Sequence, residues 1–257
     1  MNLGLGDKAV IVTGAASGIG AAIAAELAAE GVGHLLLTDR DAAGLARVAA
    51  GLAAAETATV TADLADPAAP AAIAAAAKAR FGRIDGLVNA AGITTRGSFV
   101  TGKPHDWDQL FTVNAKAGFF LMQAAIADMR ARAAAGAIVN ILSMNAHCGI
   151  AELAIYSGTK GAMQTLTKNA ANAHMADRIR VNGINLGWVA TESEHRMQAE
   201  VMGRGPDWER DAAAQLPLGR LVTAQECARL AVFLLSDASV PMSGAILDLE
   251  QKVAGAI

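Results

Sequence analysis

The segment KAVIVTGAASGIGAAIAAELAAEG, residues 8–31, joins an apolar run to a helix-like stretch through a turn rich in glycine. Residues 8–15 predict a buried strand, and residues 18–31 predict a helix closed by Gly31. The intervening TGAASGIG, residues 13–20, has glycines at 14, 18 and 20. Such a turn lets the backbone approach a pyrophosphate, and the helix that follows presents free N–H groups to it. The segment therefore predicts a dinucleotide site, although a tight turn that binds nothing can have the same glycines.

Short apolar runs alternate with longer helix-like stretches along the rest of the chain. Further strands are predicted at 34–39, 58–63, 86–92, 136–143, 180–187 and 244–249. Helices are predicted at 42–54, from about Pro67 to Phe81, within 104–134 as one or two helices, at 154–176 and at 224–235. Strands that are apolar throughout are covered on both faces. We therefore expect an α/β fold with a doubly wound, mostly parallel sheet of about seven strands, Rossmann-like, with helices on both faces.

No linker or repeat interrupts this alternation, so a single domain over residues 1–257 is predicted. Residues 188–222 are less regular and richer in Met, Trp, Arg and Glu, and are the predicted substrate lid. Apolar residues make up 53% of the chain and charged residues 18%, enough for a large core. The net charge is −3, and no basic patch indicates a nucleic-acid partner.

Cysteine usage and the N-terminus indicate the compartment. Two cysteines, Cys148 and Cys227, exclude a disulfide framework and favour a reducing environment. The N-terminal residues lack a charged region followed by an apolar one, and no apolar run has the roughly 18 residues of a membrane span. A cytoplasmic protein without a membrane partner is expected.

Asp39 ends the predicted second strand, 19 residues after Gly20. A carboxylate at this distance suits the adenosine ribose hydroxyls and would repel a 2′-phosphate, so NAD is the expected cofactor. Arg40 is adjacent and could permit some use of NADP. Asp63 and Leu64 end the third strand, where an adenine edge could rest. A solvated acid at a strand end is the alternative for both aspartates.

Tyr156 is the only tyrosine of the chain, and it stands four residues before Lys160. Residues i and i+4 share one helix face. A free phenol has a pKa of about 10, and a nearby ammonium is expected to lower it until the phenol can exchange a proton with an alcohol. Ser143, thirteen residues earlier, ends a central strand, where its hydroxyl could hold the reacting oxygen.

With these motifs the chain resembles the short-chain dehydrogenase/reductase family, of the single-domain type of about 250 residues. The matching pieces are TGAASGIG at 13–20, DL at 63–64, NAAG at 89–92, VNAKAGF at 113–119, Ser143, YSGTK at 156–160 and RVNGINLG at 180–187. The resemblance implies that Tyr156 is the acid/base, Lys160 tunes it and holds the nicotinamide ribose, and Ser143 orients the substrate oxygen. It also implies that Asn114 keeps the active-site helix bent and supports a water in the proton relay.

The resemblance further implies a cofactor site. Asn89 would steady the central strands beside the adenosine, and Ser17 stands where NADP users often have a basic residue, which again favours NAD. The expected cofactor residues are Gly14, Ser17, Gly18, Ile19, Gly20, Asp39, Asp63, Leu64, Asn89, Gly92, Tyr156, Lys160, Val189 and Thr191. Family members associate through their long helices, so a homotetramer or homodimer is expected.

Two departures from the family pattern stand near the lid and the C-terminus. Leu186–Gly187 replaces the usual Pro–Gly, which predicts a looser turn before Val189 and Thr191. Thr191 would otherwise hydrogen-bond the carboxamide. The stretch DLEQKVAG, residues 248–255, replaces a DGG-like ending.

Polar residues dominate the segments expected near the nicotinamide, including Glu194, His195 and Arg196 of the lid. The expected substrate residues are Ser143, Asn145, His147, Glu152, Tyr156 and Trp188. A lipophilic pocket needs few polar groups, so a small sugar, polyol or sugar acid is favoured. Trp188 could stack on a sugar ring or pack the lid against the sheet, and any of the polar lid residues could simply be solvated.

These observations predict an NAD-dependent oxidoreductase that interconverts a secondary alcohol and a ketone. One alternative is a short-chain reductase of a non-carbohydrate ketone. Another is a catalytically silent protein that binds NAD as a sensor, and a third is a nucleotide- or S-adenosylmethionine-binding transferase. The presence of Asn114, Ser143, Tyr156 and Lys160 favours the enzyme over the last two.

Overall fold

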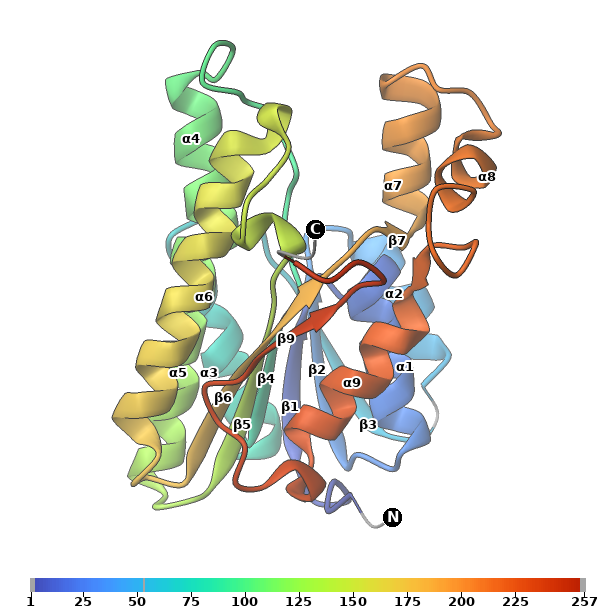
Figure 1. The fold of residues 1–257 in the computed structure, drawn as a ribbon. Coiled ribbons are helices and arrows are strands. Elements are labelled where there is room, and N and C mark those ends of the chain that lie inside the picture. Colours follow the sequence, from blue (N-terminus) through green and yellow to red (C-terminus); the bar gives the residue numbers. More distant parts are fainter. Residues whose placement is uncertain (1–2, 53, 255–257) are drawn as a thin grey trace.

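A single parallel sheet forms the centre of the protein in the computed structural model, which describes residues 3–52 and 54–254 (Figure 1). The strand order is β3-β2-β1-β4-β5-β6-β9, and all neighbours run parallel. The strands are β1 (Ala9–Thr13), β2 (His34–Asp39), β3 (Glu56–Thr61), β4 (Gly86–Asn89), β5 (Gly136–Ile141), β6 (Ile179–Leu186) and β9 (Ile246–Leu249). The order reverses direction between β1 and β4, as in a doubly wound fold. The predicted fold class and the number of strands in the main sheet are confirmed.

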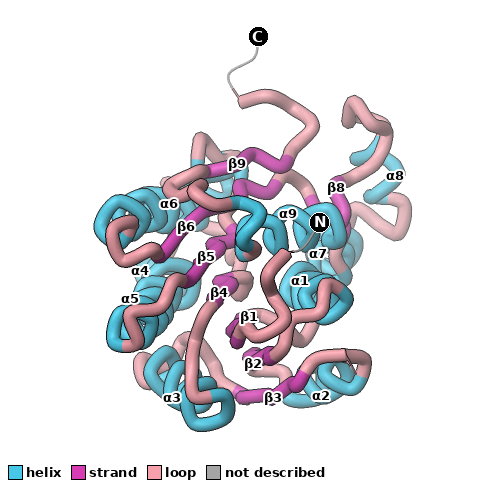
Figure 2. The backbone as a smooth tube through the Cα atoms, turned by 90° about the horizontal axis from the view of Figure 1, so that it is seen from below, coloured by secondary structure: helices cyan, strands magenta, loops and turns pink. Residues whose placement is uncertain are grey.

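Helices cover both faces of this sheet, as Figure 2 shows in the view along the strands. One face carries α1 (Gly18–Ala29), α2 (Ala42–Ala50) and α9 (Ala224–Leu235), and the other carries α3 (Ala69–Phe81), α5 (Ala117–Ala131) and α6 (Ala154–His174). The α4 helix (Pro104–Phe111) leads into α5 through a π-helix, η1 (Thr112–Lys116). Short 3₁₀ segments are η2 (Met144–Ala146), η3 (Ala151–Leu153) and η5 (Asp237–Ser239).

Several predicted elements agree with the structure to the residue, notably the strand at 34–39 and the helix at 224–235. The latter begins with a capping box, in which the Thr223 side chain and the Glu226 side chain each bind the other's backbone amide. Other predicted bounds were wrong by a few residues. The third strand lies at Glu56–Thr61, so Asp63 and Leu64 follow it rather than end it. The helix predicted over 42–54 ends at Ala50, and residue 53 lies outside the described part.

The core has two apolar layers, one on each side of the sheet. Leu27, Leu37 and Val139 belong to the layer under α1 and α9, and Ile73 and Leu87 to the layer under α3 and α5. Alanines on α1 and α9 are fully buried where the two helices meet. Small side chains at this contact let the two helix backbones approach each other closely.

The lid predicted at 188–222 rises above the carboxyl ends of the strands, on the far side of the site from α4 and the start of α6 (Figure 1). It contains β7 (Val189–Ala190), α7 (Glu192–Arg196), the π-helix η4 (Met197–Val201), α8 (Trp208–Ala213) and β8 (Val222–Thr223). The strands β7 and β8 pair with each other as a separate two-stranded sheet. A small apolar cluster around Trp208 and Leu221 gives the lid a core of its own.

One stretch of the described residues, Pro104–Ala131, is long and apolar enough to qualify as a membrane span by length and composition. Half of its most apolar window is buried inside the protein. It packs against α3 and α6 as a core helix does, and core helices of this kind meet the same two criteria.

Candidate active site

The segments that contain the predicted site residues lie at the carboxyl ends of the parallel strands (Figure 1). Because parallel strands end at one edge of the sheet, the turns that follow them surround a common space. The glycine turn follows β1, Ser143 follows β5, and the lid follows β6. The reversal of strand order between β1 and β4 falls at the same place, where open α/β sheets bind their ligands.

The glycine turn is built for close backbone contact. Gly14 has φ +66°, and a Cβ there would lie 2.8 Å from the Cα of Ala91. A Cβ on Gly20 would lie 2.2 Å from the carbonyl oxygen of Gly14. The α1 helix begins next to Ser17, whose side chain makes no capping hydrogen bond. The first amides of α1 are therefore not capped by that side chain, and the turn fits a pyrophosphate.

Asp39 is fixed beside this turn. Its carboxylate accepts hydrogen bonds from the amides of Ala16, at 3.2 Å, and Asp41, at 3.1 Å. The first bond connects the end of β2 directly to the glycine turn, so the carboxylate lies where an adenosine ribose would follow a pyrophosphate. Ile19, in the first turn of α1, packs on the core.

Asp63 and Leu64 differ in their surroundings. The Asp63 side chain is exposed and accepts a hydrogen bond from the Ala65 amide at 2.9 Å, a local turn that any exposed aspartate can form. Leu64 is half-buried and lines a small cavity together with Asn89. The amide of Asn89 donates to the Asn140 side chain at 2.8 Å and so ties β4 to β5.

Ser143, Tyr156 and Lys160 are all buried at the end of β5 and the start of α6, with 7%, 8% and 6% of their surfaces exposed. The Ser143 hydroxyl accepts hydrogen bonds at 3.2 Å from the backbone amide and the side-chain amide of Asn145. The Lys160 ammonium donates to the Ile141 carbonyl at 2.8 Å and lies 5.7 Å from the centre of the Tyr156 ring. The structure thus brings the phenol, the ammonium and the hydroxyl together.

Burial has the largest effect on the pKa values of Tyr156 and Lys160. It raises the pKa of Tyr156 to about 12; a hydrogen bond with Ser143 opposes the rise, and the negative charge of Glu194 adds to it. Burial also lowers the pKa of Lys160 to about 8. The expectation that Lys160 lowers the pKa of the phenol was wrong for the protein alone. The ammonium donates to a backbone carbonyl rather than to the phenol, and the loss of water outweighs its attraction.

Asn114 lies in the π-helix between α4 and α5. Its side chain accepts from the Ile93 amide at 2.8 Å and donates to the Ile93 carbonyl at 2.9 Å, and it also donates to Thr159 at 3.2 Å. A π-bulge of this kind breaks the regular helix and often marks a functional position. Gly92 lies nearby, since a Cβ there would be 3.3 Å from the Asn114 amide oxygen and 3.7 Å from the Lys160 ammonium.

The turn after β6 makes two long-range hydrogen bonds, and the looseness expected from Leu186 stays a prediction. The amide of Gly187 donates to the Leu249 carbonyl at 3.0 Å, and the amide of Trp188 donates to Glu250 at 3.3 Å. The replaced C-terminal stretch thus supplies the partners that hold the turn. Residue 255 of that stretch lies outside the described part.

Beyond this turn, Val189 and Thr191 take up defined positions. Val189 is buried in the core. The Thr191 hydroxyl caps α7 by accepting from the Glu194 amide at 3.2 Å. A Cβ on Gly18 would lie 3.5 Å from the Thr191 methyl group, so the start of the lid stands next to the glycine turn. The cofactor residues predicted on the two segments are therefore neighbours in space.

The remaining predicted substrate residues are placed less uniformly. Asn145 lies against Ser143, as described above, and Glu152 is exposed. The His147 imidazole Nε2 lies 2.9 Å from Asp248 and 3.1 Å from Asn185, so its ring is held toward β9 and β6. Hydrogen bonds from His147 and Asn185 outweigh burial and keep the pKa of Asp248 below its usual value. This geometry gives His147 no support as a substrate residue.

Trp188 packs within the lid. Its ring lies 5.6 Å from that of Trp208, and its indole N–H donates to Glu194 at 2.8 Å. These ring and side-chain contacts lie within the lid rather than against the sheet, so neither of the two predicted uses of Trp188 is confirmed. In the sequence analysis, Glu194 was not singled out from the other polar side chains of the lid. Its position, three residues after the Thr191 cap, was the available signal that its side chain turns back toward the start of the lid.

A glycine-rich turn, a carboxylate after the second strand and a buried Ser–Tyr–Lys–Asn group at one sheet edge define a dinucleotide-dependent oxidoreductase of the short-chain class. Residues 14–251 match the family described as Enoyl-(Acyl carrier protein) reductase. The chain belongs to the short-chain dehydrogenase/reductase family, whose members are alcohol/ketone oxidoreductases that bind NAD(P).

Two relatives are similar to this chain over nearly its whole length. Gluconate 5-dehydrogenase of Gluconobacter oxydans is 34% identical over 95% of this chain and 93% of its own. D-threitol dehydrogenase of Mycolicibacterium smegmatis is 36% identical over 96% of this chain and 92% of its own. Among solved structures, L-sorbose reductase from Gluconobacter frateurii, complexed with NADPH and L-sorbose, has a TM-score of 0.94 at 29% identity. The match covers 100% of both chains.

Proposed function

We propose that this protein is an NAD-dependent dehydrogenase that interconverts a secondary alcohol and a ketone on a sugar, polyol or sugar acid. The observation that carries the proposal is the meeting of Ser143, Tyr156 and Lys160, all buried, beside a glycine turn. The relatives named above are called dehydrogenases or reductases of gluconate, D-threitol and L-sorbose, all of them small polyhydroxylated compounds. Their chemistry supports the substrate class.

In the proposed oxidation, the substrate hydroxyl lies between Ser143 and Tyr156. Ser143 holds the oxygen while the Tyr156 phenolate removes its proton, and the hydride leaves the same carbon. When bound, an oxidised nicotinamide supplies the hydride acceptor and a positive charge near the phenol. That charge matters, because a phenol with a pKa of about 12 costs roughly 7 kcal/mol to ionise at pH 7.

The proton received by Tyr156 needs a route outward. Lys160 and Asn114 line one small cavity, which has room for about one water molecule. We propose that the proton passes from Tyr156 by way of Lys160 to such a water, which Asn114 helps to hold, and from that water to bulk solvent. The Asn114 side chain is suited to this because its hydrogen bonds to Ile93 and Thr159 hold it in one orientation.

The preference for NAD rests on Asp39. Its carboxylate, held against the glycine turn, would accept the ribose hydroxyls of NAD and repel the 2′-phosphate of NADP. Ser17 adds no positive charge at the turn. L-sorbose reductase, described with NADPH, shows that this fold accommodates the other cofactor. Direct comparison of NAD and NADP as oxidants is therefore part of the test.

The test is a set of initial rates with NAD and NADP across sugars, polyols, sugar acids and lipophilic alcohols. We expect NADH formation with polyhydroxylated substrates. Tyr156→Phe should bind NAD nearly as well as the native enzyme and lose at least about a thousandfold in kcat, because the acid/base group is gone. Turnover of lipophilic alcohols alone would contradict the substrate class, and a Phe variant that keeps most of its activity would contradict the mechanism.

A silent NAD-binding sensor is the second function considered. Transfer of deuterium from a deuterated alcohol to NAD distinguishes the two, because a sensor transfers none. We also propose a cytoplasmic homotetramer or homodimer that associates through its long helices. The half-exposed side chains of Phe119 and Phe120 on α5 suit such contacts, and native mass spectrometry would measure the number of subunits.

A further inference from the structure

Glu194 is held in one orientation by two donors on a single oxygen. The Trp188 indole donates to its Oε1 at 2.8 Å, and the Gln198 side-chain amide donates to the same atom at 2.6 Å. Among the described residues, no hydrogen bond or ion pair engages the second carboxylate oxygen, Oε2. The side chain is half-buried, so this oxygen remains a fixed acceptor with a negative charge.

A second acceptor stands next to it. Gln198 is 4% exposed, and its side-chain oxygen Oε1 is buried with no hydrogen-bond partner among the described residues. A buried acceptor without a donor costs free energy, and a hydroxyl group or water that reached this oxygen would relieve the cost. Because the amide nitrogen of Gln198 is bound to Glu194, the unpartnered oxygen lies close to the carboxylate.

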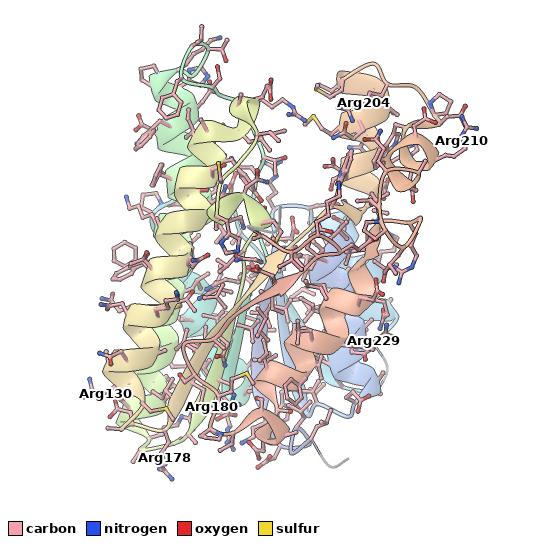
Figure 3. All side chains as sticks on the ribbon, in the orientation of Figure 1. Arg130, Arg178, Arg180, Arg204, Arg210 and Arg229 are labelled. Carbon is pink, nitrogen blue, oxygen red and sulfur yellow. The ribbon has the colours of Figure 1, made fainter. Side chains whose placement is uncertain are left out.

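Both acceptors belong to the lid, which faces the start of α6, and therefore Tyr156, across the site (Figure 1). The negative charge of Glu194 is among the causes that raise the pKa of Tyr156, which agrees with a carboxylate that faces the same space. Arg204 lies over the Trp188 ring at 5.9 Å, and Arg178 and Arg180 lie at the opposite end of the sheet (Figure 3). Ion pairing does not neutralise Glu194 within the described chain.

We propose that Glu194, with Gln198 beside it, binds a hydroxyl group of a neutral polyol or ketose and excludes substrates that have a carboxylate. The inference rests on the proposed function and narrows its substrate class. Two acceptors suit the O–H groups of a polyol next to the carbon that reacts. A carboxylate substrate at the same place would bring a second negative charge against Glu194, in a partly buried setting where repulsion is strong.

The relatives named above include both kinds of substrate, because D-threitol is neutral and gluconate is an acid. A purely structural role for Glu194, as a support for the lid, is the alternative explanation of its two hydrogen bonds. Glu194→Gln separates the alternatives, since glutamine keeps an oxygen for Trp188 and Gln198 but replaces Oε2 with a donor and removes the charge.

The experiment compares an alditol with the aldonate of the same carbon skeleton, across a series of four to six carbons, with native enzyme and E194Q. We expect the native enzyme to favour the alditol. In E194Q, kcat/KM for the alditol should fall about 10- to 100-fold, mainly through KM, which is the effect of losing one charge-assisted hydrogen bond. The ratio of aldonate to alditol activity should rise at least about tenfold, because the repulsion is gone. Melting temperature should stay within about 2 °C of the native value.

Glu192 provides the matched control. It is on the same helix, its side chain is 82% exposed, and it pairs with Arg196. E192Q should leave both substrates unchanged. A second readout is the pH profile. Removal of the Glu194 charge should move the acidic limb of kcat/KM for alditol oxidation, where the Tyr156 phenolate becomes protonated, to lower pH, since that charge raises the pKa of Tyr156. A structural support alone would not shift this limb.

Several outcomes overturn the inference. A native enzyme that prefers the aldonate, or an E194Q variant whose aldonate-to-alditol ratio is unchanged, refutes it while the dehydrogenase function stands. Loss of activity on both substrates in equal proportion, together with a lower melting temperature, indicates lid support only and also refutes it. No turnover of any polyhydroxylated compound refutes the inference and the proposed function together.

Discussion

Lys160→Met should make the protein more stable while it inactivates the enzyme. The ammonium of Lys160 is buried, and burial lowers its pKa from 10.5 to about 8. A tenfold change in proton affinity corresponds to about 1.4 kcal/mol, so the charged lysine costs the folded state about 3 kcal/mol near pH 7. Methionine fills similar space without a charge. The Ile141 carbonyl loses a hydrogen bond, which costs about 1 kcal/mol, and the net gain is about 2 kcal/mol.

The sign of this effect changes with pH in a defined way. Below pH 8 the lysine is protonated in both folded and unfolded chains, so the full penalty applies. Between pH 8 and 10.5 the folded protein releases the proton before the unfolded chain does, and the penalty disappears. The advantage of K160M should therefore be greatest near pH 7 and close to zero at pH 10.

Urea denaturation of both proteins without cofactor, at pH 7 and pH 10, measures this difference. For a chain of this length, 2 kcal/mol corresponds to a rise in melting temperature of about 4 to 8 °C at pH 7. The native protein is the proper reference at each pH, because Tyr156 and Cys227 also titrate in alkali and are present in both proteins. A K160M variant that is less stable at pH 7, or equally stabilised at both pH values, would refute the reasoning.

Two further predictions concern the cofactor and the thiols. Asp39→Ser should raise kcat/KM for NADP about 10- to 100-fold and lower that for NAD, because a fixed negative charge near the 2′-phosphate is removed; steady-state rates with both cofactors test this, and an unchanged NAD/NADP ratio would contradict it. Cys148 is exposed, whereas Cys227 is buried and burial raises its pKa to about 12. One thiol per chain should react rapidly with a disulfide reagent at pH 8 and the second only on unfolding; two fast thiols would contradict the packing of α9.

Much of the fold follows from local patterns. The strand at 34–39 and the helix at 224–235 are predicted to the residue, since an apolar run beside a polar boundary and a Thr–x–x–Glu cap are local signals. The ends of other elements depend on packing. The fourth strand stops at Asn89, three residues short of its prediction, where Thr13 accepts hydrogen bonds from the next two amides, at 3.1 and 3.0 Å. No local signal at 90–92 reveals that partner, 77 residues away.

In the candidate site, too, some features can be predicted from local sequence and others depend on packing. Tyr156 and Lys160 are recognisable because one helix turn separates them, and the glycine turn because a strand precedes it and a helix follows it. The surroundings that set the pKa values of Tyr156 and Lys160 come from distant parts of the chain. Burial of Tyr156 by segments from several parts of the chain reverses the pKa change expected from Lys160 alone, and the π-helix at Asn114 has no evident signature in TVNAK.

The amino-acid sequence by itself determined the order of the main strands and helices and the family, and it singled out the candidate acid/base group and the candidate turn for the dinucleotide. These depend on periodicity and on spacing within a few residues, where chain geometry alone sets which side chains share a face. The tertiary structure alone decided that Thr191 lies beside the glycine turn, that Glu250 accepts a hydrogen bond from the turn after Leu186, and that His147 turns to Asp248. Contacts between residues this far apart in the sequence, and the loss of water that changes their pKa values, exist only once the layers have packed.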